Sequence, residues 1–177
     1  MRPDLRFDFI ADMQDGTLTI RREFAAGRQM VWDCYTRSEL LDRWYAPRPL
    51  TTKTRSFDFR EGGHWHFAMI DPNGTHYWSR TDYETITPID GYTGYDGFTD
   101  ETGVVNPDLP RSRQELRLAD KGDHTLVETR VSYDSPEDLQ KVIDMGMEEG
   151  LTSTLERLDE LLASLIAEAQ ALPAQNA

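Results

Sequence analysis

The chain has 177 residues, of which 38% are hydrophobic and 10% aromatic, enough apolar material for one globular domain with a sizeable core. Its formal net charge of −13 repels phosphate backbones and anionic membranes, so no nucleic-acid partner is expected. No apolar run approaches the roughly 20 residues that span a bilayer, and the acidic N-terminus lacks the apolar core of a signal peptide. We therefore expect a cytoplasmic protein without membrane insertion.

The first elements follow from two alternating segments, LRFDF and TLTIRREF, which flank the turn signal Asp15-Gly16. This pattern predicts a strand or hairpin, with residues 1–12 as an extra edge strand. Two short helices are predicted next. The first lies within GRQMVWDCYT, and the second runs from Glu39 to Tyr45 with Ser38 as its N-cap.

The single cysteine, Cys34, excludes an internal disulfide framework and a multi-cysteine zinc site. It lies in the first predicted helix, and no histidine is near it in the sequence. A small core residue is therefore favoured over a nucleophile.

From Thr51 to Asp134 the pattern has period two and is broken by turn residues, which predicts about six antiparallel strands. The expected strand segments are TTKTRSFDF, HWHFAMID, THYWSRTDYETIT, YTGYDGFTD, SRQELRLAD and HTLVETRVSYD. Gly62 and Gly63 separate the first two and predict a tight bend. Phosphate binding there is disfavoured because no helix start follows the glycines.

The C-terminal part is predicted to be helical. Ser135, Pro136 and Asp138 have the form of a helix start, and the segment GMEEGLTSTLERLDELLASLIAEA places its leucines on one stripe. Residues 167–177 are expected to form a flexible tail. The order of elements predicts an α+β fold, a curved antiparallel sheet of about six to seven strands wrapped around a long C-terminal helix, with two short helices after the first strand.

Two histidines, His64 and His66, alternate with Trp65, Phe67 and Met69. Because the large apolar set faces inward, the histidines are expected on the outer, wetter face. A catalytic zinc needs at least three converging protein ligands, and only His76 could reach the same region. No metal and no cofactor are therefore expected.

Four segments carry a resemblance to a known family: EFAAGRQMVWDCYTRSELLDRWYAP, FDFREGGHWHFAM, GFTDETGVVNPDLP and MGMEEGLTSTLERLDELLA. The chain resembles the bacterial proteins related to the C-terminal domain of the activator of the 90-kDa heat-shock-protein ATPase, within the START-like, helix-grip superfamily. The resemblance covers roughly Thr17 to Ala163. Gly27 stands where the family usually has Pro, and Leu151 where Trp is common, so a pocket there should be shaped differently.

The resemblance implies one START-like domain over residues 1–177, with a core of about 17–166 and a mostly apolar cavity between the sheet and the C-terminal helix. The small residues Gly146, Gly150 and Ser153 fit such a cavity, because small side chains either admit the sheet or leave a hollow. The inward-facing candidates for its lining are Trp65, Phe67, Met69, Tyr83, Phe98, Gln114, Leu116, Thr129, Val131, Met147, Gly150 and Leu151. Ordinary core packing is the competing interpretation for each. Gln114 and Thr129 are the informative pair, since an inward polar group needs a partner, which a ligand or water would supply.

Three hypotheses about function follow from the expected fold and cavity. The first is binding of a small apolar or amphipathic molecule in the cavity. The second is a cyclase or hydrolase, but no catalytic residue is assigned: the pattern leaves the facing of Asp82 and Asp96 open, and Tyr83 is the best proton donor.

The third function is a co-chaperone-like interaction module that docks through the acidic residues Glu148, Glu149 and Glu156 of the last helix. A homodimer would fit the segment LRFDF, since an exposed edge strand invites pairing.

Overall fold

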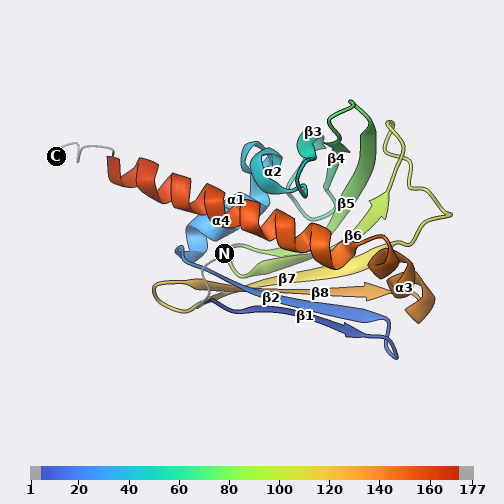
Figure 1. Ribbon diagram of the computed structural model, residues 1–177, viewed down its shortest axis with the longest axis horizontal. Coiled ribbons are helices and arrows are strands. Elements are labelled where there is room, and N and C mark those ends of the chain that lie inside the picture. Colours follow the sequence, from blue (N-terminus) through green and yellow to red (C-terminus); the bar gives the residue numbers. More distant parts are fainter. Residues whose placement is uncertain (1–4, 172–177) are drawn as a thin grey trace.

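A curved sheet wraps around a long helix in the computed structural model, which describes residues 5–171 (Figure 1). The strands are β1 (Phe7–Asp12), β2 (Thr17–Phe24), β3 (Thr51–Phe57), β4 (His64–Ile70), β5 (His76–Thr87), β6 (Gly91–Phe98), β7 (Ser112–Asp120) and β8 (Thr125–Tyr133). The helices are α1 (Arg28–Thr36), α2 (Ser38–Trp44), α3 (Pro136–Asp144) and α4 (Met147–Ala171). In the described part of the chain, none of these helices has the length and apolar character that crossing a membrane requires.

The sheet is antiparallel throughout, in the order β1-β2-β8-β7-β6-β5-β4-β3. Strands β3 to β8 form the predicted meander, and each of the six predicted segments contains one strand. Strand β2 precedes the helices in sequence but pairs with β8, with Ile20 opposite Thr129. The predicted α+β fold is confirmed. The described sheet has eight strands instead of six to seven, because Phe7–Asp12 pairs with β2 along its whole length.

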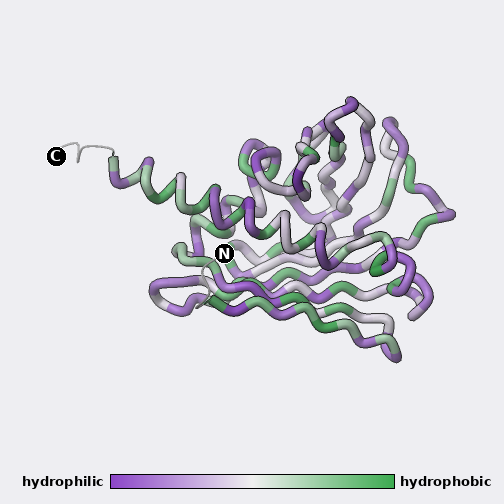
Figure 2. Tube along the Cα trace, in the orientation of Figure 1, coloured by the Kyte–Doolittle hydropathy of each residue, from purple (hydrophilic) through white to green (hydrophobic). Residues whose placement is uncertain are grey.

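Helix α4 crosses the concave face of the sheet (Figure 1). Its 25 residues bury Leu155, Leu158, Leu161 and Leu162 against the sheet and the two short helices. Burying each leucine contributes roughly 1.5–3 kcal/mol, so this stripe is a main source of stability. Figure 2 shows hydrophobic and hydrophilic positions alternating along several strands, as expected for a sheet with one buried face.

The start of α3 follows the predicted capping pattern. Ser135 has an extended backbone, its side chain accepts a hydrogen bond from the backbone N–H of Asp138 at 3.2 Å, and Pro136 occupies the first turn. Gly146, with φ of +85°, ends this segment and allows the chain to turn into α4.

Polar contacts join α4 to the short helices. The guanidinium of Arg157 donates hydrogen bonds to the carbonyl oxygens of Ala46 (2.8 Å) and Leu50 (2.7 Å), just after α2. The indole N–H of Trp44 donates to the carbonyl of Cys34 at 2.9 Å. The bonds from Arg157 satisfy carbonyl groups in the connection between α2 and β3, and the bond from Trp44 joins α2 to α1.

The bend at Gly62-Gly63 is a feature of the backbone. Gly62 has φ of +76°, and a Cβ atom on Gly63 would lie 2.1 Å from the carbonyl oxygen of Asp58. The N–H of Tyr83 donates to the carbonyl of Gly63 at 3.0 Å, so the bend also extends the pairing with β5. These glycines turn the chain sharply into β4, which agrees with the predicted bend.

Three local expectations are corrected. His66 is only 4% exposed, because the chain after β6 folds over the outer face and its ring lies near Thr99 and Asp100. The second helix starts at Ser38 itself, with Arg37 as the extended cap. Helix α4 continues to Ala171, so residues 167–171 of the expected tail are helical; the remaining part, 172–177, lies outside the described residues.

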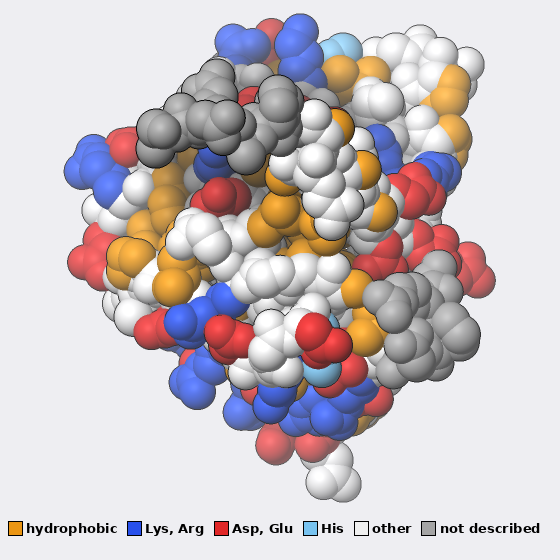
Figure 3. All heavy atoms as spheres, turned by 90° about the vertical axis from the view of Figure 1, so that its left-hand side faces the viewer, with side chains coloured by type: hydrophobic (Ala, Val, Ile, Leu, Met, Phe, Trp, Pro, Cys, Tyr) orange, Lys and Arg blue, Asp and Glu red, His pale blue; other side chains and the backbone are white. Residues whose placement is uncertain are grey.

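The surface carries many charges of both signs. Figure 3 shows acidic and basic side chains around hydrophobic patches on the face from which α4 projects. Many of the charges form exposed ion pairs, such as Arg37 with Glu39 and Arg48 with Glu160. Exposed pairs of this kind typically contribute less than about 1 kcal/mol each, so the interior decides the stability of the fold.

Candidate functional site

Two adjoining hollows lie between the sheet and α4, with volumes of about 280 and 370 Å³. Both are lined by Tyr45, Gln114, Met147 and Leu151, so we describe them as the smaller and larger lobes of one cavity. The lining of the larger lobe extends to the surface at the α3–α4 junction, where Met145 is 62% exposed. A cavity of this size accommodates a small molecule.

Most of the lining is apolar and comes from the strands that the alternating pattern turned inward. The predicted residues that border the cavity are Phe67, Met69, Phe98, Gln114, Leu116, Thr129, Val131, Met147, Gly150 and Leu151. Trp65 and Tyr83 do not border it; they are 2% and 3% exposed. Trp65 stacks on Phe67 with ring centroids 3.8 Å apart, and Tyr83 packs edge-on against Phe59 at 4.8 Å, so both lie in a packed aromatic cluster.

Several residues that line the cavity were not predicted from the sequence. Ile20 of β2 lines both lobes, and its inward facing follows from the alternation in TLTIRREF. Tyr45 also lines both; its ring meets Trp65 and Phe67 edge-on at 4.7 and 5.5 Å. No sequence signal gives its position, because it lies at the end of α2 where the helical pattern stops.

A band of polar side chains crosses the cavity floor diagonally, one residue on each of five neighbouring strands. Thr81 lies opposite Asp96, and Gln114 lies two residues from Ser112, the partner of Asp96. Thr129 and Arg22 continue the diagonal on β8 and β2. From the strand spacing and the rise per residue along this diagonal, Asp96 and Arg22 are roughly 25 Å apart. The band has an acidic end and a basic end.

Asp96 forms the acidic end, in the smaller lobe. Its Oδ1 accepts hydrogen bonds from the hydroxyl of Thr81 (2.5 Å) and the side-chain amide of Gln114 (3.1 Å). Burial raises the pKa of Asp96 to about 6, and the hydrogen bond from Thr81 offsets only part of that rise. Along β6, Asp96 alternates with Tyr92, Gly94 and Phe98, so these residues share the inner face. Their alternation is the signal that places Asp96 inward.

Arg22 forms the basic end, in the larger lobe. Its side chain is 1% exposed and forms an ion pair with Asp159 of α4, whose side chain is 21% exposed. The Nε and Nη1 atoms of Arg22 are buried without a hydrogen-bond partner in the described structure. The rings of Phe7 and Phe24 lie 5.8 and 5.6 Å from the guanidinium carbon, so aromatic faces partly replace the missing partners.

The other reactive side chains do not form a site. Cys34 is fully buried, and burial raises the pKa of its thiol to about 12. His64 lies 2.9 Å from the hydroxyl of Ser56, and His76 stacks on Trp78 at 5.6 Å. Within residues 5–171, no group of three or more His, Cys, Asp or Glu side chains is placed to hold a metal ion.

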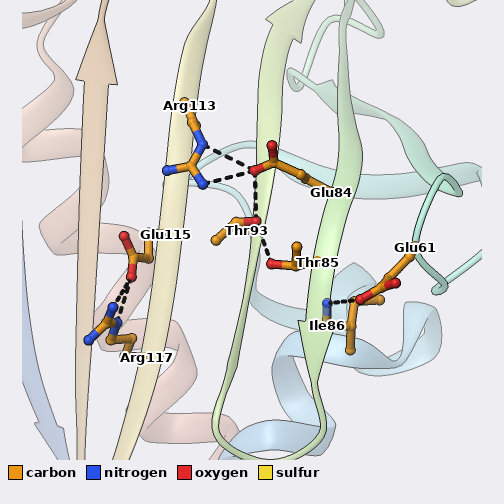
Figure 4. Close-up of polar contacts among 8 residues, drawn as sticks. All are labelled: Glu61, Glu84, Thr85, Ile86, Thr93, Arg113, Glu115 and Arg117. Atoms are coloured by element: carbon orange, nitrogen blue, oxygen red, sulfur yellow. Dashed lines mark hydrogen bonds and ion pairs between the residues drawn. The ribbon is translucent and has the colours of Figure 1, made fainter.

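Another hollow, of about 530 Å³, lies at one end of strands β5, β6 and β7. Figure 4 shows the polar groups of this region: Arg113 donates to Glu84 at 2.8 Å, Glu84 accepts from Thr93, and Arg117 pairs with Glu115. Glu61 also accepts a hydrogen bond from the backbone N–H of Ile86 at 3.0 Å. Because these groups satisfy one another, the inner cavity is the better candidate site.

The chain is similar to a known protein family and to several solved structures. The family model described as "Activator of Hsp90 ATPase homolog 1-like protein" matches residues 25–163. A search of the curated proteins finds no match. Among solved structures, a protein from Arthrobacter aurescens is 27% identical with a TM-score of 0.84, covering 89% of this chain and 91% of that one.

Two further structures resemble the fold. Protein Ms6760 from Mycobacterium smegmatis is 30% identical with a TM-score of 0.81, covering 89% of this chain and 96% of that one. CalU16 from Micromonospora echinospora is 23% identical with a TM-score of 0.59, covering 92% of this chain and 77% of that one. The similarity to CalU16 concerns the fold alone.

Proposed function

The chain belongs to the family of Activator of Hsp90 ATPase homolog 1-like proteins, and on that premise we propose that it binds a small apolar or amphipathic molecule between its sheet and α4. The observation that carries the proposal is the two-lobed cavity. Its walls are mainly apolar, while Gln114 and Thr129 place polar groups on its floor. Apolar walls with a few polar anchors suit a ligand that is held by burial and oriented by hydrogen bonds.

Gly150 supplies a sharp test of this proposal. It lines the larger lobe from the first turns of α4, and the nearest atoms to an added Cβ belong to Pro47, at 3.8 and 3.9 Å. A methyl group therefore fits without displacing its surroundings. A leucine side chain is longer and would occupy part of the 370 Å³ lobe.

The experiment is a titration of the purified protein with an environment-sensitive apolar dye. We expect saturation near one dye per chain, retained in Gly150→Ala and weakened by about tenfold or more in Gly150→Leu. Circular dichroism and thermal unfolding of each variant show that it is folded. A folded wild-type protein without saturable binding of the dye, or of other apolar probes, would overturn the proposal.

A second proposal is an interaction module that docks on a basic partner such as a chaperone. It draws on α4, where Glu148 and Glu149 are exposed and Glu156 is half-buried. Reversing these three charges to lysine should abolish capture of a partner while preserving the fold. The same reversal should leave dye binding unchanged, which separates the two proposals.

Homodimerisation is a further proposal about assembly. Strand β1 is a terminal strand of the sheet, and Ile10 on it is 50% exposed. An edge strand with an exposed apolar side chain suits pairing with a second copy. The molar mass in solution, compared with that of Ile10→Lys, checks this expectation.

A further inference from the structure

The two charged ends of the polar band differ in how they meet the cavity. The Nε and Nη1 atoms of Arg22 are closed off by protein, and its charge is neutralised by Asp159. An oxygen atom in the cavity cannot reach these nitrogens unless the surrounding side chains move. Asp96 is half-buried and lines the smaller lobe, so part of its carboxyl group is open to a bound molecule.

We propose that Asp96 and Gln114 form a head-group subsite that selects a neutral hydrogen-bond donor, an alcohol or a phenol, and rejects carboxylates. This inference rests on the proposed function, since it specifies which amphipathic molecules the cavity takes.

The hydrogen bonds leave acceptors, not donors, for a ligand. Both donors near Asp96, the hydroxyl of Thr81 and the amide of Gln114, bind Oδ1. In the part of the chain that the structure describes, neither Oδ2 of Asp96 nor Oε1 of Gln114 accepts a hydrogen bond. A hydroxyl group has one hydrogen to donate and meets this need, whereas a carboxylate would set its own lone pairs against those of Asp96.

The charges around Asp96 also disfavour a carboxylate head group. The nearby guanidinium groups of Arg80 and Arg111 each bind Asp82, at 2.7 Å, on the opposite face of the sheet. No cation in residues 5–171 forms an ion pair with Asp96. Arg111 acts on its carboxyl group and Arg80 borders the smaller lobe, but both arginines are paired with Asp82, so a second negative charge in this lobe would be only weakly compensated. Repulsion between like charges is strong where water is scarce.

The charge of Asp96 attracts an ammonium head group, but the number of its donors and its loss of hydration make it fit less well than a hydroxyl group. It carries three N–H donors, and the subsite offers it two open acceptors, Oδ2 of Asp96 and Oε1 of Gln114. The third donor would be buried without a partner, and a charged group loses more hydration than a hydroxyl on entering an apolar cavity.

Four compounds with one ring system separate these possibilities: naphthalene, 2-naphthol, 2-naphthoate and 2-naphthylmethylammonium. At about pH 7.5 the second is neutral, the third is an anion and the fourth is a cation. Binding of each to the full chain is measured by ligand fluorescence, with solubility-limited compounds also tested by displacement of the dye. We expect naphthalene to bind, 2-naphthol to bind about tenfold or more tightly than 2-naphthoate, and the ammonium compound to bind more weakly than 2-naphthol.

Variants at one position identify the cause of the preference. Asp96→Asn removes the charge and keeps the shape: its oxygen retains the bonds from Thr81 and Gln114, and its N–H2 group takes the open position of Oδ2. A carboxylate can accept from this N–H2 group, so 2-naphthoate should gain about fivefold or more. The hydroxyl of 2-naphthol can accept from it and donate to Oε1 of Gln114, so its binding should change by less than about threefold. Asp96→Val removes the acceptor, so 2-naphthol should lose its advantage over naphthalene. Asp82→Asn is the matched control, because the same charge is removed on the opposite face of the sheet, and its binding profile should equal that of the wild type.

The failure of this inference and the failure of the proposed function give different results. If naphthalene binds, but 2-naphthol and 2-naphthoate bind equally, the cavity exists and the head-group inference is overturned. If 2-naphthoate binds most tightly and loses this preference in Arg22→Met, the head group lies at the basic end, which also overturns the inference. If none of the four compounds binds the folded protein, the proposed function itself is overturned.

Discussion

Arg22 on β2 donates a hydrogen bond to Asp159 on α4, and this ion pair connects the sheet to the helix from inside the molecule. The arginine is 1% exposed, whereas the aspartate keeps 21% of its side chain in solvent. Such a pair contributes little net stability relative to apolar residues of the same size, but a charge left alone in the interior is costly. Removing only one partner should therefore be far more harmful than replacing both.

Asp159→Asn tests the coupling of α4 to the sheet. The variant should lose about 2–3 kcal/mol of unfolding free energy, slightly less than for a fully enclosed pair because Asp159 is partly exposed. Urea denaturation measures this loss. Glu160→Gln is the control on the same helix, since its pair with Arg48 is half exposed or more on both sides and should contribute less than about 1 kcal/mol. Equal losses in the two variants would contradict the prediction.

Gly150→Ala should stabilise the fold. Gly150 is within α4, and an added Cβ stays 3.8 Å or more from Pro47. Alanine in a helix interior is favoured over glycine by up to about 1 kcal/mol, because glycine loses more backbone entropy on folding. The expected result is a gain of about 0.5–1 kcal/mol in urea denaturation. A loss of stability would show that the backbone at this position needs glycine.

The stability of the protein should depend on the ionisation of Asp96. Its pKa in the folded state, about 6, lies above the ordinary value of 3.8, so the folded state binds the proton more tightly than the unfolded state. Stability therefore falls as the pH rises from about 4 to about 6, and above that range the full penalty of about 3 kcal/mol is present. Asp96→Asn carries no such penalty, and its stability relative to the wild type should rise by about 2–3 kcal/mol between pH 4 and pH 7.5.

Denaturation of both proteins at several pH values measures this difference. The charged groups that act on Asp96 are Arg111 and Asp82, and the neighbouring Tyr45, Tyr83, Tyr92 and Tyr133 have pKa values raised by burial, so these tyrosines stay neutral over the range. Thr81→Val provides a second check, because the hydrogen bond from Thr81 lowers the pKa of Asp96 and its loss should move the window to higher pH. A stability difference that is constant with pH would be evidence against a raised pKa of Asp96 in the folded state.

His66 should make the segment after β6 sensitive to acid. Its Nε2 lies 3.3 Å from the carbonyl oxygen of Asp100 and from the hydroxyl of Thr99. Burial lowers the pKa of His66, and the charges of Arg55, Arg80 and His64 add to this effect, which the hydrogen bond to Asp100 opposes. The folded state thus favours the neutral ring, so this contribution is present above the ordinary histidine pKa and is lost as the pH falls below it.

Hydrogen exchange of the amides of residues 100–104 reports this change. After correction for intrinsic rates, exchange should be about threefold or more faster at pH 5.5 than at pH 7.5 in the wild type. In His66→Gln the dependence on pH should largely disappear, while His76→Gln should behave like the wild type, because His76 lies on the exposed end of β5. An equal dependence in His66→Gln would assign the effect to another group.

The sequence determined the elements and most of the inward faces. Alternation in HWHFAMI and SRQELRLAD turned Phe67, Met69 and Leu116 inward, and the leucine stripe identified α4, because these patterns depend only on the local backbone period. Burial of the apolar set then required a sheet curled around the helix. For the same reason, Gln114 and Thr129 could be recognised as polar groups on an inner face.

The tertiary structure alone decided what covers each face. His66 points outward as its strand predicts, yet it is buried, because a segment more than thirty residues later folds over it. The partners of Asp96 were decided only by the pairing of β6 with its neighbours, which brought Thr81 and Gln114 onto the same carboxyl oxygen. Local periodicity specifies the side of a strand on which a residue lies, whereas partners, burial and the pKa depend on chain segments that meet only in the folded state.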